Sequence, residues 1–208
     1  YTRFDIGERG AILNNSHRNA QTQLGGWIQG NPWLAGAEAR IIVNQVNSSH
    51  PSLLNGYIEV GGRRAEVVVA NPAGIRVDGA GFINASRALL TTGQPHYQGG
   101  ALAGFAVRQG EVSVAGRGLD TQGSDYTHIL AGAAHINAPV WGRDVRIIAG
   151  QNDVSDDGGS ATAAGVPSPS GASPTYAIDT GVLGGMYAGK ITLVTTHPDA
   201  VIRNRGQI

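Results

Sequence analysis

The chain has 208 residues, no cysteine and a formal net charge of zero, and it combines 32 glycines with only 14% charged residues. Few charges and many glycines argue against a helical protein, whose exposed faces usually carry Glu and Lys. The balanced charge also argues against nucleic acid or an anionic membrane as a partner, and the lack of cysteine excludes disulfides and thiolate metal sites.

The first thirty residues are more polar and irregular than the rest of the chain, as in the stretch FDIGERGAILNNS. The short runs that follow them favour a solenoid, and a solenoid needs a cap because its first coil would otherwise expose strand edges and apolar core. We therefore expect residues 1–30 to form an amino-terminal cap.

The dipeptide Asn-Pro occurs twice, in Asn31-Pro32-Trp33-Leu34 and in Asn71-Pro72-Ala73-Gly74. Both stretches suit a type I turn, because Asn hydrogen-bonds the backbone that follows it and Pro fixes φ at the second position. The residue chemistry favours structural corners between strands. The alternative interpretation is that rigid, exposed turns form a recognition epitope.

Short apolar runs, each ended by Gly, Asn or Asn-Pro, fill the middle of the chain. Residues 66–70 (EVVVA) predict a strand, and GIRVDG places Ile75 and Val77 on one face of the next strand. The adjacent Arg63 and Arg64 would then lie at a hairpin tip between YIEV and AEVVV. Further runs of this kind are FIN, ALLTT, GFAVRQG, EVSVAG, THILAG, AHINAP, DVRIIAG, KITLVTT and AVIRN.

The spacing of these runs predicts a parallel β-helix. The runs begin roughly six to ten residues apart, closer than in a sandwich, and three of them with their turns make a coil of about 20–25 residues. Gly and Asn suit the corners, and small aliphatic side chains suit the interior. A β-sandwich or jelly roll is the competing all-β fold.

Two segments do not fit coils. Residues 93–101 (GQPHYQGGA) indicate an excursion from the β-helix. Residues 155–175 are rich in Gly, Ser, Ala and Pro, a composition typical of a mobile surface loop. The apolar pattern resumes after the second segment, so we interpret it as a loop within one domain.

The stretch VVVANPAGIRVDGAGFINASRALLTTG (67–93) resembles the two-partner secretion (TPS) domain of filamentous haemagglutinin-like exoproteins, also called the haemagglutination activity domain. That family carries the motifs Asn-Pro-Asn-Leu and Asn-Pro-Asn-Gly-Ile. Here they read Asn31-Pro32-Trp33-Leu34 and Asn71-Pro72-Ala73-Gly74-Ile75, with a departure at the third position of each. AILNNS (11–16) and LGGMYAGKI (183–191) are also similar to family stretches, so the resemblance spans nearly the whole chain.

The resemblance implies a right-handed parallel β-helix and a single TPS domain over 1–208, belonging to a larger secreted or cell-surface exoprotein of a Gram-negative bacterium. It implies recognition by a TpsB-type outer-membrane β-barrel transporter through periplasmic polypeptide-transport-associated (POTRA) domains, and folding of the exoprotein from this domain onward. No cofactor, nucleic acid or small-molecule substrate is implied, and we expect a monomer. The positions expected to carry secretion, by contact or by holding the fold, are Asn31, Pro32, Trp33, Leu34, Asn71, Pro72, Ala73, Gly74 and Ile75.

Catalytic interpretations rest on weaker patterns. The densest acidic run is Asp153, Asp156 and Asp157, which we interpret as the solvated base of the 155–175 loop rather than a calcium site. His128 and His135 lack a third close ligand and are expected at the surface or at corners. A polysaccharide lyase would need a cluster of carboxylates and cations on one strand face; the nearest to it are Arg143, Asp144 and Arg146. We therefore expect neither a catalytic site nor a metal site.

Besides secretion and polysaccharide cleavage, a third hypothesis for the function is a direct adhesin whose surface binds a host glycan or protein. Its only support is the set of three tryptophans, Trp27, Trp33 and Trp141, since an aromatic ring can stack on a sugar. Two of these residues flank the expected cap, so packing at the cap is the simpler interpretation.

Overall fold

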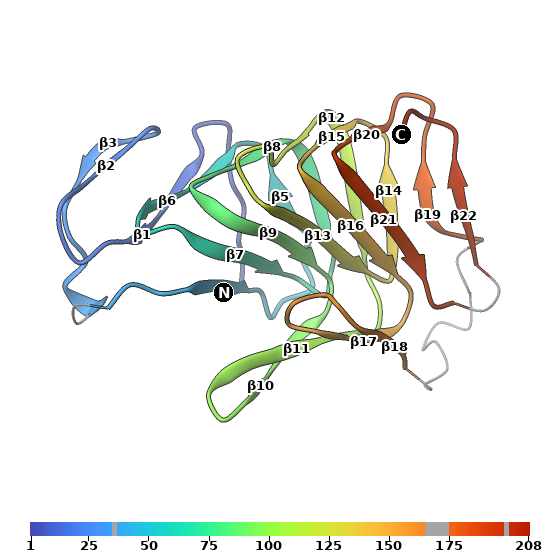
Figure 1. Ribbon diagram of the computed structural model, residues 1–208, viewed down its shortest axis with the longest axis horizontal. Helices are drawn as coiled ribbons and strands as arrows, with labels where there is room; N and C mark the ends of the chain where they lie inside the picture. Colours follow the sequence, from blue (N-terminus) through green and yellow to red (C-terminus); the bar gives the residue numbers. More distant parts are fainter. Residues whose placement is uncertain (35–36, 165–174, 198–199) are drawn as a thin grey trace.

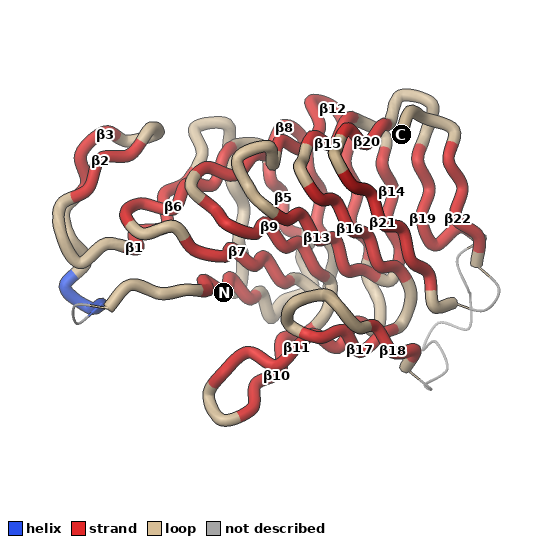
Figure 2. Tube along the Cα trace, in the orientation of Figure 1, coloured by secondary structure: helices blue, strands red, loops and turns tan. Residues whose placement is uncertain are grey.

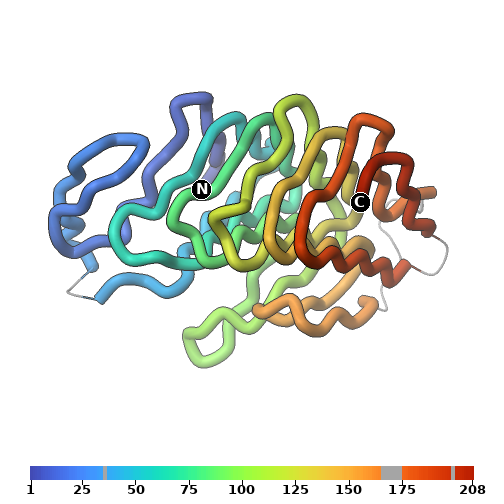
Figure 3. Tube along the Cα trace, turned by 45° about the horizontal axis from the view of Figure 1, so that its top comes forward, coloured from blue at the N-terminus to red at the C-terminus, as the bar shows by residue number. Residues whose placement is uncertain are grey.

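The computed structural model describes residues 1–34, 37–164, 175–197 and 200–208, and these residues form strands that wind into stacked coils (Figures 1 and 2). The coils follow one another from the N-terminal end of the molecule to the C-terminal end (Figure 3). The predicted parallel β-helix is confirmed, and the competing sandwich is wrong. No helix among the described residues is long and apolar enough to cross a membrane.

Two parallel sheets form the walls of the β-helix. The six-stranded sheet contains β4 (Ile41–Gln45), β7 (Ala65–Ala70), β9 (Ala85–Thr91), β13 (Tyr126–Ala131), β16 (Asp144–Ala149) and β21 (Lys190–Thr195). The main path of the ten-stranded sheet contains β1 (Ala11–Asn15), β6 (Tyr57–Gly62), β8 (Ile75–Ile83), β12 (Glu111–Asp120), β14 (Ala133–Ile136), β19 (Tyr176–Thr180) and β22 (Val201–Asn204). Three short strands pair beside this path: β5 (Ser52–Leu54), β15 (Pro139–Trp141) and β20 (Gly185–Tyr187).

Neighbouring strands of the six-stranded sheet come from successive coils. Val67 lies beside Ile42 on one side and beside Ala88 on the other, and Thr127 lies beside Val145. These pairings give uninterrupted coils of 18 to 25 residues, close to the expected length. Longer steps occur only where the chain leaves the β-helix between two paired strands, as between β9 and β13.

The main core lies inside the coils, between the two sheets. Inward-facing positions alternate with exposed ones along β8, where Ile75 and Val77 are buried and Arg76 and Asp78 are exposed. This alternation, predicted from GIRVDG, follows from the pleat of a strand, which sends successive side chains to opposite faces. Val, Ile, Leu and Ala supply most of this core, as predicted.

A second core lies outside the coils, against the outer face of the six-stranded sheet. A four-stranded antiparallel sheet packs on the C-terminal halves of the strands on that face (Figure 1). Its strands are β10 (Gln94–Gln98), β11 (Ala101–Val107), β17 (Asn152–Ser155) and β18 (Ala161–Ala163). Phe105 on β11 is fully buried and belongs to one cluster with Leu89 and Leu130 of the six-stranded sheet. The C-terminal halves of β7, β9, β13 and β16 are therefore buried on both faces, which explains the continuous apolar runs there.

The four-stranded sheet confirms one excursion and corrects two expectations. Residues 93–101 leave the β-helix as predicted, but GFAVRQG does not form a coil strand, because its apolar residues lie in β11 and pair with β10 and β17. The 155–175 segment is not a loop throughout, since β18 lies within it. Residues 165–174 of that segment lie outside the described residues.

The N-terminal end carries an antiparallel hairpin of β2 (Ala20–Thr22) and β3 (Gly26–Ile28) (Figure 1). The hairpin packs on β6, where a Cβ at Gly61 would come within 2.6 Å of the Ile28 side chain. The buried carboxylate of Glu59 accepts hydrogen bonds from the backbone N–H groups of Gln23 and Leu24, at 2.7 and 2.8 Å. Glu59 thus holds the hairpin turn over the first coils, as a cap requires.

Arg63 and Arg64 do not lie at a hairpin tip. The strands on either side of them, β6 and β7, belong to different sheets and do not pair with each other. Arg63 and Arg64 instead turn the corner between the two walls, where Arg64 donates to the Asp125 carboxylate at 2.8 Å. A parallel β-helix makes corners at places where an antiparallel sheet would make hairpins.

Candidate functional site

The second Asn-Pro turn is part of the buried framework. Asn71 is fully buried; its amide nitrogen donates to the His50 carbonyl at 2.9 Å and to the Ser52 hydroxyl at 3.0 Å. Its side-chain oxygen accepts from the Ala73 N–H at 2.9 Å, and its carbonyl accepts from the Gly74 N–H at 3.0 Å. The predicted turn forms, but its Asn side chain is not displayed to a partner.

The first Asn-Pro turn has the same local geometry in an exposed setting. The Asn31 side-chain oxygen accepts from the Trp33 N–H at 3.1 Å, and its carbonyl accepts from the Leu34 N–H at 3.3 Å. Pro32–Leu34 form a short 3-10 helix, η1, and no residue of that helix is buried. The Asn31 N–H donates to the Ser16 carbonyl at 2.7 Å, which fixes the turn to the cap.

Two tryptophans in the first 34 residues are exposed to solvent. Trp33 is 91% exposed and Trp27, on β3, is 73% exposed. The expectation that they pack at the cap is therefore wrong. Trp141 is half-buried on β15 and stacks on Tyr187, with 6.4 Å between ring centroids. The first turn is thus exposed at Pro32 and Trp33, whereas in the second turn Asn71 is fully buried and Pro72 and Ala73 are half-buried.

The family model described as TPS secretion domain matches residues 1–208. The chain belongs to this family. The TPS domain also resembles the crystal structure of a filamentous hemagglutinin secretion domain, with a TM-score of 0.89 and 32% identity over 98% of this chain and 70% of that chain.

Curated relatives of the TPS domain are much longer proteins. It is 47% identical over 208 residues to "Toxin CdiA" of Yersinia pestis and 48% identical over 210 residues to "tRNA nuclease CdiA-2" of Burkholderia pseudomallei. It spans 6% and 7% of the length of these two relatives. The nuclease named in the second belongs to that whole protein. Exoproteins with a TPS domain are secreted or cell-surface proteins of Gram-negative bacteria.

The acidic run of the TPS domain is spread over a strand and a turn. Asp153 lies on β17 and pairs with Arg108 at 2.6 Å. Asp157 lies in the turn after β17, where the Ser155 hydroxyl and the Gly159 N–H donate to its carboxylate and lower its pKa. Among the described residues, no group of three or more His, Cys, Asp or Glu side chains could hold a metal ion.

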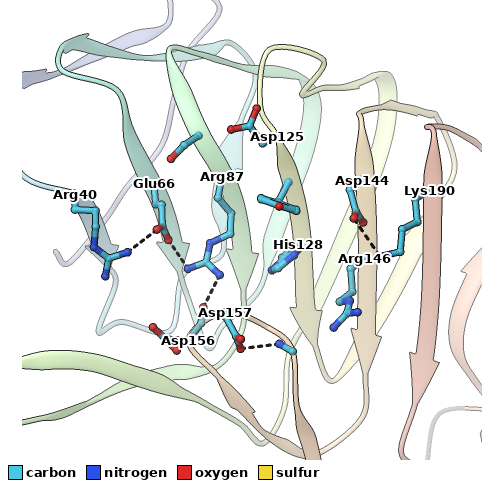
Figure 4. Close-up of a pocket in the computed structure, with 13 residues that line it drawn as sticks. Arg40, Glu66, Arg87, Asp125, His128, Asp144, Arg146, Asp156, Asp157 and Lys190 are labelled. Carbon is cyan, nitrogen blue, oxygen red and sulfur yellow. Dashed lines mark hydrogen bonds and ion pairs between the residues drawn. The ribbon is translucent and has the colours of Figure 1, made fainter.

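Of the three candidate lyase residues, Asp144 and Arg146 come together on one face, and Arg143 does not join them. Arg143 donates to the Gln122 carbonyl at 3.1 Å, whereas Asp144 pairs with Lys190 at 3.3 Å and Arg146 donates to the Gly158 carbonyl. Asp144 and Arg146 share the outer face of β16, on which Figure 4 shows them beside Lys190. Of these three residues, only Asp144 forms a cross-strand ion pair within the described part of the chain.

His128 is buried, contrary to the expectation of a surface or corner residue. It is 5% exposed on β13, between Arg87 and Arg146 (Figure 4), and Gly158 lies directly against its ring. Burial lowers the pKa of His128 to about 4, and the positive charges of Arg87 and Arg146 act in the same direction. THILAG reads as an ordinary coil strand. His128 is buried only because the turn after β17 of the four-stranded sheet packs against its ring.

We expect the TPS domain to lose stability as the pH falls from about 6.5 to about 4. In this window the unfolded chain protonates His128 and the folded chain does not, so the unfolding free energy should fall by about 3 kcal/mol. Carboxylates with a lowered pKa, such as Asp157, add a loss that begins at the lower end of this window and grows below it. Urea unfolding between pH 4 and pH 7 measures the slope. His128→Gln should flatten the slope of unfolding free energy against pH. His96→Gln, at an exposed position on β10, should leave this slope unchanged. Equal slopes in the unaltered domain and both variants would contradict the assignment of the pH dependence to His128.

Two further residues hold these elements in place, and no sequence pattern predicted their roles. Asn15 is buried and joins the cap to the first corner, since its amide donates to the Ala39 and Arg63 carbonyls at 2.9 Å. Arg87 is buried, pairs with Glu66 and donates to the Asp156 carbonyl. Both lie in stretches that resemble the family, but nothing in their local sequence marks these roles, because their partners lie 21 to 69 residues away.

Proposed function

We propose that this TPS domain is recognised during secretion by the POTRA domains of a cognate TpsB-type outer-membrane transporter. The first Asn-Pro turn, Asn31–Leu34, is the contact surface in this proposal, together with Trp27. The second motif, Asn71 to Ile75, acts by holding the fold. The observation that carries the assignment is the contrast in exposure between two turns of the same local geometry.

Exposed tryptophans support a contact role. Large aromatic side chains in solvent are enriched at interfaces, where they supply much of the binding energy. The Asx geometry of Asn31 presents Trp33 on a fixed backbone, which lowers the entropy that binding must remove. The buried amide of Asn71 offers no such surface to a partner.

We further propose that the domain is a template for folding of the longer exoprotein. β21 and β22 lie at the ends of their sheets, and Ile191, Leu193 and Ile202 of the last coil are only partly buried. Gln207 already pairs with Gly185, so the chain continues its winding beyond β22. Coils of a solenoid need only their neighbours, so stacking can advance as the chain emerges from the transporter.

Trp33→Ala is expected to reduce transporter-dependent secretion at least about tenfold, because truncation of an aromatic anchor typically costs about 2 kcal/mol of binding or more. The unfolding free energy should change by less than about 0.5 kcal/mol, since the side chain makes few contacts. The measurement is the amount of domain released into the medium, with an export signal attached, in cells with and without the transporter. Leu183→Ala is the matched control, because Leu183 is 83% exposed in a turn far along the chain.

The two possible failures are distinguishable. If the unaltered domain is released equally without the transporter, recognition by the transporter is wrong. If release needs the transporter but Trp33→Ala and Trp27→Ala are released normally, recognition stands and the assigned surface is wrong.

A further inference from the structure

A cavity of about 480 Å³ lies on the outer face of the six-stranded sheet, beside the second core (Figure 4). Its floor is formed by outward-facing side chains of successive coils. The turn after β17 closes one side, held by Arg87, which donates to the Asp156 carbonyl, and by Arg146, which donates to the Gly158 carbonyl. The volume falls within the range of about 300–1,000 Å³ typical of small-molecule sites.

The cavity wall presents hydrogen-bond donors and acceptors in alternation, one coil after another. Arg40 pairs with Glu66 at 2.8 Å, and Arg87 pairs with the other oxygen of Glu66. Further along the same face, Asp144 pairs with Lys190 at 3.3 Å. These pairs hold each charged group in place while leaving lone pairs and N–H groups unused, because a carboxylate can accept about four hydrogen bonds and an ammonium can donate three.

An aromatic ring stands at the rim of the cavity. Tyr126 is 52% exposed, lines the cavity and leans against the His128 ring, with 6.3 Å between centroids. In the strand register Tyr126 lies beside Arg87 and one residue before the pair Thr127–Val145, so it occupies the row of charged side chains. A tyrosine in this position offers an apolar ring face and a hydroxyl.

Two buried nitrogen atoms of the floor have no partner among the described residues. They are Nε of Arg87 and Nδ1 of His128, in side chains that are more than nine-tenths buried. An unpaired buried polar atom is costly, so proteins keep few of them. Both side chains line the cavity, and the two unpaired nitrogen atoms lie beneath its surface.

From these observations we infer that the cavity binds an oligosaccharide. A sugar hydroxyl donates one hydrogen bond and accepts two, so it is matched by a wall on which carboxylates and cations alternate. Hydrogen bonds to charged groups are the strong ones, and the exposed ring of Tyr126 suits the apolar face of a sugar. This inference is independent of transporter recognition, which we assign to the cap.

The charge of the cavity favours a sugar over a free anion. Four cationic side chains line it, and five carboxylates offset them. A phosphate or a nucleic acid would meet those carboxylates at close range, whereas hydroxyl groups use both signs of charge. The same balance distinguishes the cavity from basic grooves that bind nucleic-acid backbones.

The test is binding of the 208-residue domain to a printed array of neutral and acidic oligosaccharides, followed by saturation-transfer NMR with the sugars retained. We expect saturable binding of at least one oligosaccharide, weakened about tenfold or more by Tyr126→Ala and by Asp144→Asn. Tyr97→Ala is the matched control, because Tyr97 is 51% exposed on β10, outside the cavity, and should leave the affinity unchanged. Inorganic phosphate is the probe for a simple anion site.

Several results would overturn the inference: no retained oligosaccharide, equal loss of affinity in the Tyr97 variant, or binding of phosphate alone. Thermal unfolding of each variant verifies that the fold persists. If Tyr126→Ala is secreted as well as the unaltered domain, the cavity is functionally distinct from the surface that we assign to the transporter.

Discussion

Phe105→Ala should lower the unfolding free energy by about 4 kcal/mol, the largest loss expected here from a single side chain. Phe105 is fully buried at the centre of the second core, and truncating such a ring removes its transfer energy and leaves a cavity. For a domain of this size the loss corresponds to a fall in melting temperature of roughly 10 °C. Urea unfolding monitored by circular dichroism gives the value.

The structure also predicts where the Phe105→Ala domain loosens. The second core is separate from the core inside the coils, so hydrogen exchange should accelerate first in β10, β11 and β17. Tyr97→Ala changes an exposed aromatic residue of the same four-stranded sheet and should cost less than about 0.5 kcal/mol. Uniform acceleration across both walls of the β-helix would show that the two cores do not act as separate units.

Asn71→Ala is the second large effect, with an expected loss of about 3 kcal/mol. The substitution removes two hydrogen bonds donated by the amide and one accepted by it, and it leaves the His50 carbonyl and the Ala73 N–H without these partners. Asn31→Ala removes the corresponding turn bond at a partly exposed position and should cost only about 1 kcal/mol. Parallel urea titrations of the two variants compare the losses directly.

Secretion of the two Asn variants then distinguishes the roles of the motifs. If Asn71 holds the fold, release of Asn71→Ala should fall in proportion to its lost stability and recover when a stabilising substitution elsewhere is added. An Asn71→Ala domain that keeps its stability but is not released would instead assign the second motif to contact with the transporter. The outcome for Asn31→Ala should follow that for Trp33→Ala, because Asn31 fixes the backbone that carries the tryptophan.

The two cores also have a consequence for folding during export. β11 leaves the β-helix after β9, but its partner β17 follows only after β16, so the four-stranded sheet cannot close until two further strands of the six-stranded sheet are in place. Arg87 and Arg146 then fix the turn after β17 to the outer face. The four-stranded sheet therefore joins coils that are not adjacent in the sequence. It stabilises the β-helix only once several coils have formed.

The amino-acid sequence by itself determined the local features of this fold. Period-2 alternation in GIRVDG placed Ile75 and Val77 inside, the frequent Gly and Asn marked corners, and both Asn-Pro turns formed as their residues predict. These features depend on a few neighbouring residues, and a strand's pleat or a turn's φ angles need nothing more distant. The family motifs supplied the handedness and the secretion role that the pattern of strands alone left open.

Only the tertiary structure decided which strand pairs with which, and so which faces are covered. GFAVRQG reads as a coil strand, yet β11 pairs in the outer sheet; His128 reads as a surface residue, yet that same sheet buries it. Trp33 reads as a packing residue, yet the backbone of η1 leaves it in solvent. In each case burial depends on a segment 20 or more residues away, or on the absence of one, and no local pattern carries that information. The exposed turn and the polar cavity, the two surfaces proposed here for binding, arise from the same long-range packing.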